Sequence, residues 1–107
     1  MMKRAETIKS KVDFNRIIKN GQYFKNEYYV IYKEKNENNE ELYGIAISKK
    51  VGKAFLRNKL KRQTRAIIDK NRKTFKKGYN YIIMIRKNCA NANYNQLDFA
   101  LSSLIEK

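Results

Sequence analysis

The chain has 107 residues, enough for one domain with a hydrophobic core and too few for two. Its 25 Lys and Arg outnumber ten Asp and Glu, and the net charge of +15 indicates a polyanionic partner: RNA, DNA or an acidic membrane surface. Hydrophobic residues make up 42% of the chain, which excludes a disordered basic tail, so we expect one folded domain over residues 1–107.

The residue types that are rare or missing narrow the chemistry further. There is no His, which removes the commonest general base and the commonest metal ligand. Cys89 is the only Cys, which excludes an internal disulfide and a cysteine zinc site and fits a reducing cytoplasm. Residues 1–20 contain no apolar signal segment, and no run approaches the length of a membrane span. We therefore expect a cytoplasmic protein with no membrane partner.

The N-terminal part predicts a basic arm followed by a helix. Residues 1–9 are basic and lack periodicity, which is typical of a flexible arm. Ser10, with Asp13 three residues later, resembles a capping box, and the apolar residues that follow have helical spacing. We expect a helix over residues 11–20 that ends at Gly21.

Three strand segments and a loop follow this helix. Residues 23–33 alternate aromatic or β-branched with polar residues, which predicts one bent strand or two short strands split near Asn26. Residues 34–41 are polar and predict a hairpin loop. Residues 42–48 predict another strand, and its face of small side chains predicts a shallow groove.

A basic block connects this strand to the second half of the chain. Residues 49–65 hold eight Lys or Arg in 17 positions and no acid, about twice the density of an even spread. Gly52 separates a basic loop from a segment with helical spacing. At about 100° per residue, one broad side of this helix is apolar and is expected to be buried. That side holds Leu56, Leu60, Thr64, Ile67 and Ile68.

The neighbouring side of the same helix is basic. Arg57, Lys61 and Arg65 follow one another at intervals of four, and Asn58 and Arg62 extend the row. Like charges at this spacing cost an isolated helix roughly 0.2–0.5 kcal/mol per pair. A solvated basic face is the structural alternative, but the absence of acids and the Asn within the row favour contact with phosphate and sugar.

The remaining chain predicts one strand and one helix. Residues 71–78 form a polar, basic connection, and the apolar run 79–85 predicts a central strand covered on both faces. Residues 91–95 form a polar turn in which Asn93 and Gln96 can cap a last helix. The buried stripe of that helix is expected to hold Leu97, Leu101, Leu104 and Ile105.

These elements predict an α+β sandwich in the order α-β-β-β-α-β-α, with helices packed on a four-stranded, mostly antiparallel sheet. The general rule for strand-helix-strand connections predicts a right-handed crossover.

The basic block and its surroundings resemble the bacterial ribonuclease P protein component. The resemblance rests on Ile47-Ser48-Lys49-Lys50-Val51-Gly52-Lys53-Ala54, then Arg57-Asn58-Lys59-Leu60-Lys61-Arg62 and Arg65. It extends to Asp13-Phe14, Gly21 and the strand from Tyr79 to Arg86, in the expected order.

The resemblance implies a non-catalytic subunit of ribonuclease P. The family's RNA subunit, with bound magnesium, removes the 5′ leader of precursor tRNA, and the protein binds that RNA subunit and the leader. No cofactor or metal bound by the protein alone is implied, the protein is expected to be a monomer without a DNA partner, and the family's ribosomal-protein-like fold implies a left-handed crossover. The RNA-facing set carried over from the family is Lys49, Lys50, Lys53, Arg57, Asn58, Lys59, Lys61, Arg62 and Arg65; the leader cleft is lined by Phe14, Ile18 and Tyr32.

Two positions depart from the family pattern. Lys59 stands where the family motif has a second Arg, so the charge is kept and the bidentate guanidinium is lost. Ile18 stands where an aromatic residue is frequent, which reduces the scope for base stacking there.

Three other functions fit parts of the pattern. A ribosomal or other structural RNA-binding protein shares the charge and the basic helix but needs no leader cleft. A self-sufficient small nuclease would need a carboxylate or Tyr base, and the acids are scattered along the sequence. A DNA-binding regulator would need a dimer element or a helix-turn-helix pattern, and neither is present in the sequence.

Overall fold

The computed structural model describes residues 11–36, 41–71, 73, 75 and 78–105, and for 11–13 and 41 the backbone only. The predicted arm over residues 1–9 and the capping role of Ser10 lie outside this part of the chain. Among the described residues the order of helices and strands is as predicted, and two short 3-10 helices are present in addition. The elements are α1 (Lys11–Asn20), β1 (Gln22–Lys25), β2 (Tyr29–Lys35), β3 (Glu41–Ile47), η2 (Lys49–Val51), α2 (Ala54–Lys70), β4 (Tyr79–Ile85), η3 (Lys87–Asn91) and α3 (Tyr94–Ile105).

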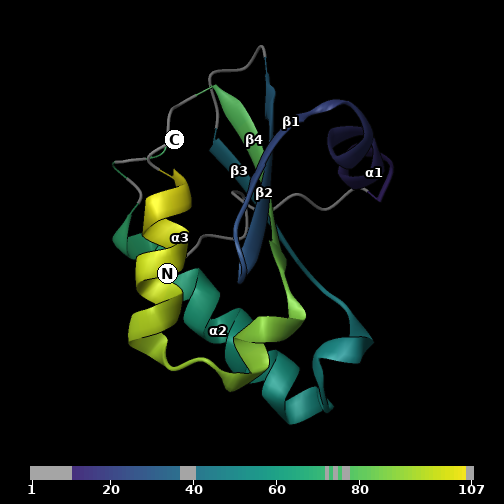
Figure 1. Ribbon diagram of the computed structural model, residues 1–107. Helices are drawn as coiled ribbons and strands as arrows, with labels where there is room; N and C mark the ends of the chain where they lie inside the picture. The colour runs from purple at the N-terminus through teal and green to yellow at the C-terminus, as the bar shows by residue number, and fades with distance from the viewer. Residues whose placement is uncertain (1–10, 37–40, 72, 74, 76–77, 106–107) are drawn as a thin grey trace.

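The strands form one mixed sheet in the order β1-β2-β4-β3. β1 with β2 and β2 with β4 are antiparallel, whereas β3 and β4 are parallel and joined through α2. The hairpin predicted around residues 34–41 is wrong, because β4 lies between β2 and β3 in the sheet. The central position predicted for residues 79–85 is confirmed, since β4 pairs on both sides and is mostly buried. Figure 1 shows α1 on one face of the sheet and the pair α2 and α3 on the other. The handedness of the crossover stays a prediction.

The main core lies between the sheet and the pair α2 and α3. The apolar side predicted for the basic helix is confirmed, with Leu60, Ile67 and Ile68 buried and Leu56 half-buried. Thr64 is also fully buried. The cost of burying its hydroxyl is offset by a 3.1 Å hydrogen bond between its Oγ1 and the hydroxyl of Tyr29. In the predicted buried stripe of α3, Leu97, Leu101 and Leu104 are buried and Ile105 is half-buried.

An aromatic cluster belongs to this core, beside β3 and β4. Phe75 packs against Tyr43 and Tyr81 with ring centroids 5.1 and 4.8 Å apart, and it is 5% exposed. The segment 71–78 was predicted as a polar, basic connection, and that prediction did not include the buried contact of Phe75 with the sheet.

Local hydrogen bonds explain where two of the elements begin. The Asn26 Oδ1 accepts from the amides of Tyr28 and Tyr29, which turns the chain between β1 and β2 at the predicted position. The predicted cap of α3 is confirmed, because the Asn93 Oδ1 accepts from the Gln96 amide while the Gln96 Oε1 accepts from the Asn93 amide. The predicted turn over residues 91–95 is shorter than expected, since η3 reaches Asn91.

Candidate nucleic-acid interface

The basic block begins at a tight connection after β3. Ser48 caps η2, and its Oγ accepts a 3.2 Å hydrogen bond from the Lys50 amide. Val51 is 7% exposed and holds this short helix against the protein. Lys49 and Lys50, the two predicted RNA-facing residues of this connection, are exposed to solvent.

The start of α2 favours an anion. Its N-cap is Lys53, which makes no side-chain capping hydrogen bond, and the first turn contains no acidic residue. The first amides of a helix carry partial positive charge and donate readily to phosphate or carboxylate oxygens. The exposed Lys53 side chain adds a full positive charge at the same position.

The basic residues of α2 differ in exposure. Asn58, Lys59, Arg62 and Arg65 are exposed, whereas Lys61 and Arg57 are half-buried at the edge of the core. The Nε of Arg57 is buried, with no hydrogen-bond partner within the part of the chain that the structure describes. Any contact of this guanidinium with an external oxygen would therefore have to use its two terminal nitrogens.

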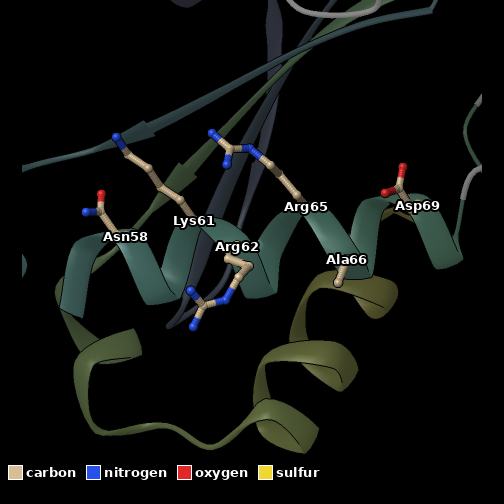
Figure 2. A pocket seen from close by; sticks show the side chains of 6 residues that line it. All are labelled: Asn58, Lys61, Arg62, Arg65, Ala66 and Asp69. Carbon is tan, nitrogen blue, oxygen red and sulfur yellow. The ribbon is translucent and has the colours of Figure 1, made fainter. Parts of the chain in front are cut away.

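A concavity of about 690 Å³ lies along this helix. Figure 2 shows Asn58, Lys61 and Arg65 extending from one side of α2 toward the same region. The spacing in the sequence predicted this group. The complete lining is Asn58, Lys61, Arg62, Arg65, Ala66 and Asp69.

Two lining residues were not predicted as part of this surface. Ala66 and Asp69 lie one turn beyond Arg62 and Arg65, so continuing the helical spacing was the signal that would have found them. The small side chain of Ala66 leaves room between the longer cations. Asp69 places a carboxylate at the C-terminal end of the concavity, where it limits how far a polyanion can extend along the helix.

The three leader-cleft candidates lie around the opposite face of the sheet. Phe14 contacts this face, since a Cβ built at Gly44 would lie 2.6 Å from the Phe14 Cε2. Tyr32 belongs to the same face, because Tyr32, Ile82 and Gly44 are paired across β2, β4 and β3. Ile18 is half-buried one turn after Phe14. The predicted shallow groove is filled at Gly44 by the Phe14 ring, so this detail of the prediction is wrong.

An ion pair and a second aromatic residue complete this surface. The Arg16 guanidinium donates to both carboxylate oxygens of Glu34 at 2.9 and 3.2 Å, which ties α1 to β2. Tyr23 on β1 is paired with Tyr32, and their ring centroids are 5.9 Å apart. Tyr23 is 59% exposed and was not predicted; the pairing of adjacent strands was the available signal.

The potential nucleophiles are held in unreactive forms. Burial raises the pKa of the Cys89 thiol to about 11, and that thiol donates to the Tyr28 carbonyl. Burial also raises the pKa of Tyr29. Within the described ranges, no group of three or more Cys, Asp or Glu is arranged to hold a metal ion. The cationic side chains along α2 are suited to binding an anionic polymer.

A search of the described helices for one long and apolar enough to cross a bilayer finds none.

Comparisons with known proteins agree with this geometry. Residues 2–107 match the family model described as Ribonuclease P. The Ribonuclease P protein component of Mycoplasma capricolum is 38% identical over 109 residues, covering 99% of this chain and 98% of the relative. That of Clostridioides difficile is 32% identical, covering 97% of this chain and 92% of the relative.

Solved structures of the same kind have the same fold. The RNase P protein from Thermotoga maritima has a TM-score of 0.86 at 31% identity, covering 94% of this chain and 96% of that one. The RNase P protein of Staphylococcus aureus has a TM-score of 0.89 at 31% identity, covering 96% and 94%.

Proposed function

Because this chain belongs to the ribonuclease P protein family, we propose that it is the protein subunit of ribonuclease P and assists removal of the 5′ leader from precursor tRNA. Its partners are the RNA subunit and precursor tRNA, and it acts as a monomer in the cytoplasm. The proposal rests on two surfaces that lie on opposite sides of the sheet. One is the cationic surface of α2, and the other is the aromatic surface beside α1.

The α2 surface binds the RNA subunit. Its exposed cations are spaced along a rigid helix, so several phosphates can be neutralised together without demands on base sequence. Neutralising six to ten phosphates gives an affinity that falls roughly 10³ to 10⁵-fold between 50 and 200 mM salt. Lys59 contributes as a point charge, whereas Arg57 and Arg62 can each donate two hydrogen bonds to one phosphate.

The aromatic surface beside α1 holds the single-stranded leader. Tyr32 and its neighbour Tyr23 offer rings on which bases can stack, at about 1–3 kcal/mol per base. Phe14 extends from α1 over the sheet and borders this surface. Ile18 adds apolar contact but has no aromatic ring for stacking. Stacking tolerates any base, which suits a subunit that meets many different leaders.

In this proposal the RNA subunit carries the chemistry, with its own bound magnesium. The protein lowers the repulsion between two polyanions and orients the leader, and neither task requires a side chain that transfers a proton. A structural RNA-binding protein would use the α2 surface in the same way and would have no use for the aromatic one.

The test compares precursor tRNA with and without its leader, bound by the complex of this chain and the RNA subunit. We expect the leader to increase affinity, and Tyr32→Ala to remove that increase while the complex still assembles. Equal affinity for both tRNAs would favour the structural alternative.

A further inference from the structure

Phe55 is the second residue of α2 and is 73% exposed. Burying a Phe side chain is worth roughly 1.5–3 kcal/mol, so leaving one in water at the start of a helix gives up that stabilisation. Its neighbours are unusual for an apolar residue. Lys53 precedes it by two positions and Arg57 follows it by two.

The geometry of the helix places Phe55 at the end of the cationic face. Residues three, four and seven positions later lie on the same side of an α-helix, and here these are Asn58, Lys59 and Arg62. All three are exposed, and Asn58 and Arg62 line the concavity along α2. The Phe55 ring therefore continues the surface assigned to the RNA subunit.

We propose that Phe55 is a stacking platform for an unpaired base of the RNA subunit, with Asn58 and Lys59 placed to contact that base or its phosphate. The inference rests on the proposed function and adds a mode of contact to it. An aromatic ring beside cations is the arrangement by which proteins hold unpaired nucleotides, since the ring takes the base and the cations take the backbone. Within a duplex the faces of the bases are covered by their stacked neighbours, so the ring could not stack on them.

Phe99 offers a matched comparison on the same chain. It is 77% exposed but lies on α3, which contains no Lys or Arg. It lines a separate concavity of about 330 Å³ that also includes Tyr28 and Leu104. The cations nearest to this equally exposed ring are already engaged, because Lys70 pairs with Asp98 and Arg86 donates to the Asn26 carbonyl.

The absence of Trp from the sequence permits a direct optical test. Phe55→Trp and Phe99→Trp each introduce a single indole, and each full-length variant is titrated with a bacterial ribonuclease P RNA. We expect strong quenching of the Phe55→Trp emission and little change for Phe99→Trp. Phe55→Ala should weaken RNA binding about 5- to 150-fold, the equivalent of losing one stacked base. Phe55→Leu should resemble Ala, since it keeps the apolar area and loses the ring.

Several outcomes would overturn the inference. RNA binding without quenching of Phe55→Trp, or with equal quenching of both variants, would refute stacking while leaving the proposed function intact. Equal quenching of Phe55→Trp by polyglutamate would show that any polyanion produces the signal. Failure of the unsubstituted chain to bind the RNA would overturn the proposed function and this inference together. Circular dichroism should show both Trp variants folded, since each replaced ring is mostly exposed.

Discussion

The contact between Phe14 and Gly44 sets how closely α1 approaches the sheet, and Gly44→Ala tests it. A Cβ at this position would lie 2.6 and 3.2 Å from the Cε2 and Cδ2 of the Phe14 ring. Both distances are shorter than normal van der Waals contact, so the ring has to move, and α1 with it. No backbone strain is involved, because Gly44 lies within a regular strand.

The expected loss follows from the cost of overpacking, which is typically about 1–3 kcal/mol. For a domain of this size, each kcal/mol lowers the melting temperature by about 4–8 °C, so Gly44→Ala should melt roughly 4–24 °C lower. Leader affinity should also fall, because Phe14 lies on the same face of the sheet as Tyr32 and its ring is displaced. RNA-subunit affinity and its salt dependence should be unchanged, since α2 lies on the other face of the sheet.

The assay combines thermal unfolding with binding of precursor tRNA to the assembled complex. Gly52→Ala is the control for stability, because its Cβ would meet only the flexible end of Leu56, at 2.7 Å, and should cost less. Adding Phe14→Leu to Gly44→Ala should restore part of the stability and none of the stacking. An unchanged melting temperature with unchanged leader affinity would refute the packing argument. Equal losses of leader and RNA-subunit binding would refute the separation into two surfaces.

Three further predictions follow from the charges, the rings and the buried thiol. Arg62→Ala should reduce the slope of log affinity for the RNA subunit against log salt by about one. Lys73→Ala, which removes an exposed cation outside α2, should change that slope less. Identical slopes for both variants would contradict a defined phosphate contact. Tyr32→Ala should lower leader affinity by about 1–3 kcal/mol in the holoenzyme and leave assembly intact; a loss of assembly would refute its assignment to the leader. The Cys89 thiol, with its pKa raised from 9.0 to about 11, stays protonated in the folded chain while it ionises in the unfolded one, so the free energy of unfolding should fall between pH 9 and 11. Denaturant titrations across that range should show a smaller fall for Cys89→Ala, and an equal fall would assign the effect elsewhere, for example to Tyr29.

The hydrophobic periodicity of the sequence predicts those parts of the fold in which a single helix or strand buries one of its faces. The buried side of α2, the bounds of β4 and the reciprocal cap formed by Asn93 and Gln96 were predictable for that reason. Each depends on residues within a few positions of one another, so the sequence contains the complete signal.

Features that depend on distant segments meeting were not predictable in this way. Small residues on β3 suggested an empty groove, but the Phe14 ring from α1 fills it, and no local pattern encodes that approach. Phe75 lies in a polar stretch, and only the positions of Tyr43 and Tyr81 make it part of the core.

The first residues of α2 were also not predictable, although they lie close together in the sequence. The predicted apolar pattern begins at Leu56, whereas α2 begins at Ala54. Lys53 supplies no capping side chain, so the usual signal of a helix start is missing and Phe55 was left unassigned. The cations themselves were predictable, because their charge and spacing are written directly in the sequence.

The central claim is that this chain supports an RNA-catalysed cleavage, and reconstitution with a bacterial ribonuclease P RNA at low magnesium tests it most directly. The measured quantity is the rate of 5′ leader removal from precursor tRNA. We expect slow cleavage by the RNA alone, restored cleavage when the chain is added, and no cleavage by the chain alone. No rescue of the RNA, or specific cleavage by the protein without it, would show that the chain is not the protein subunit of this RNA enzyme.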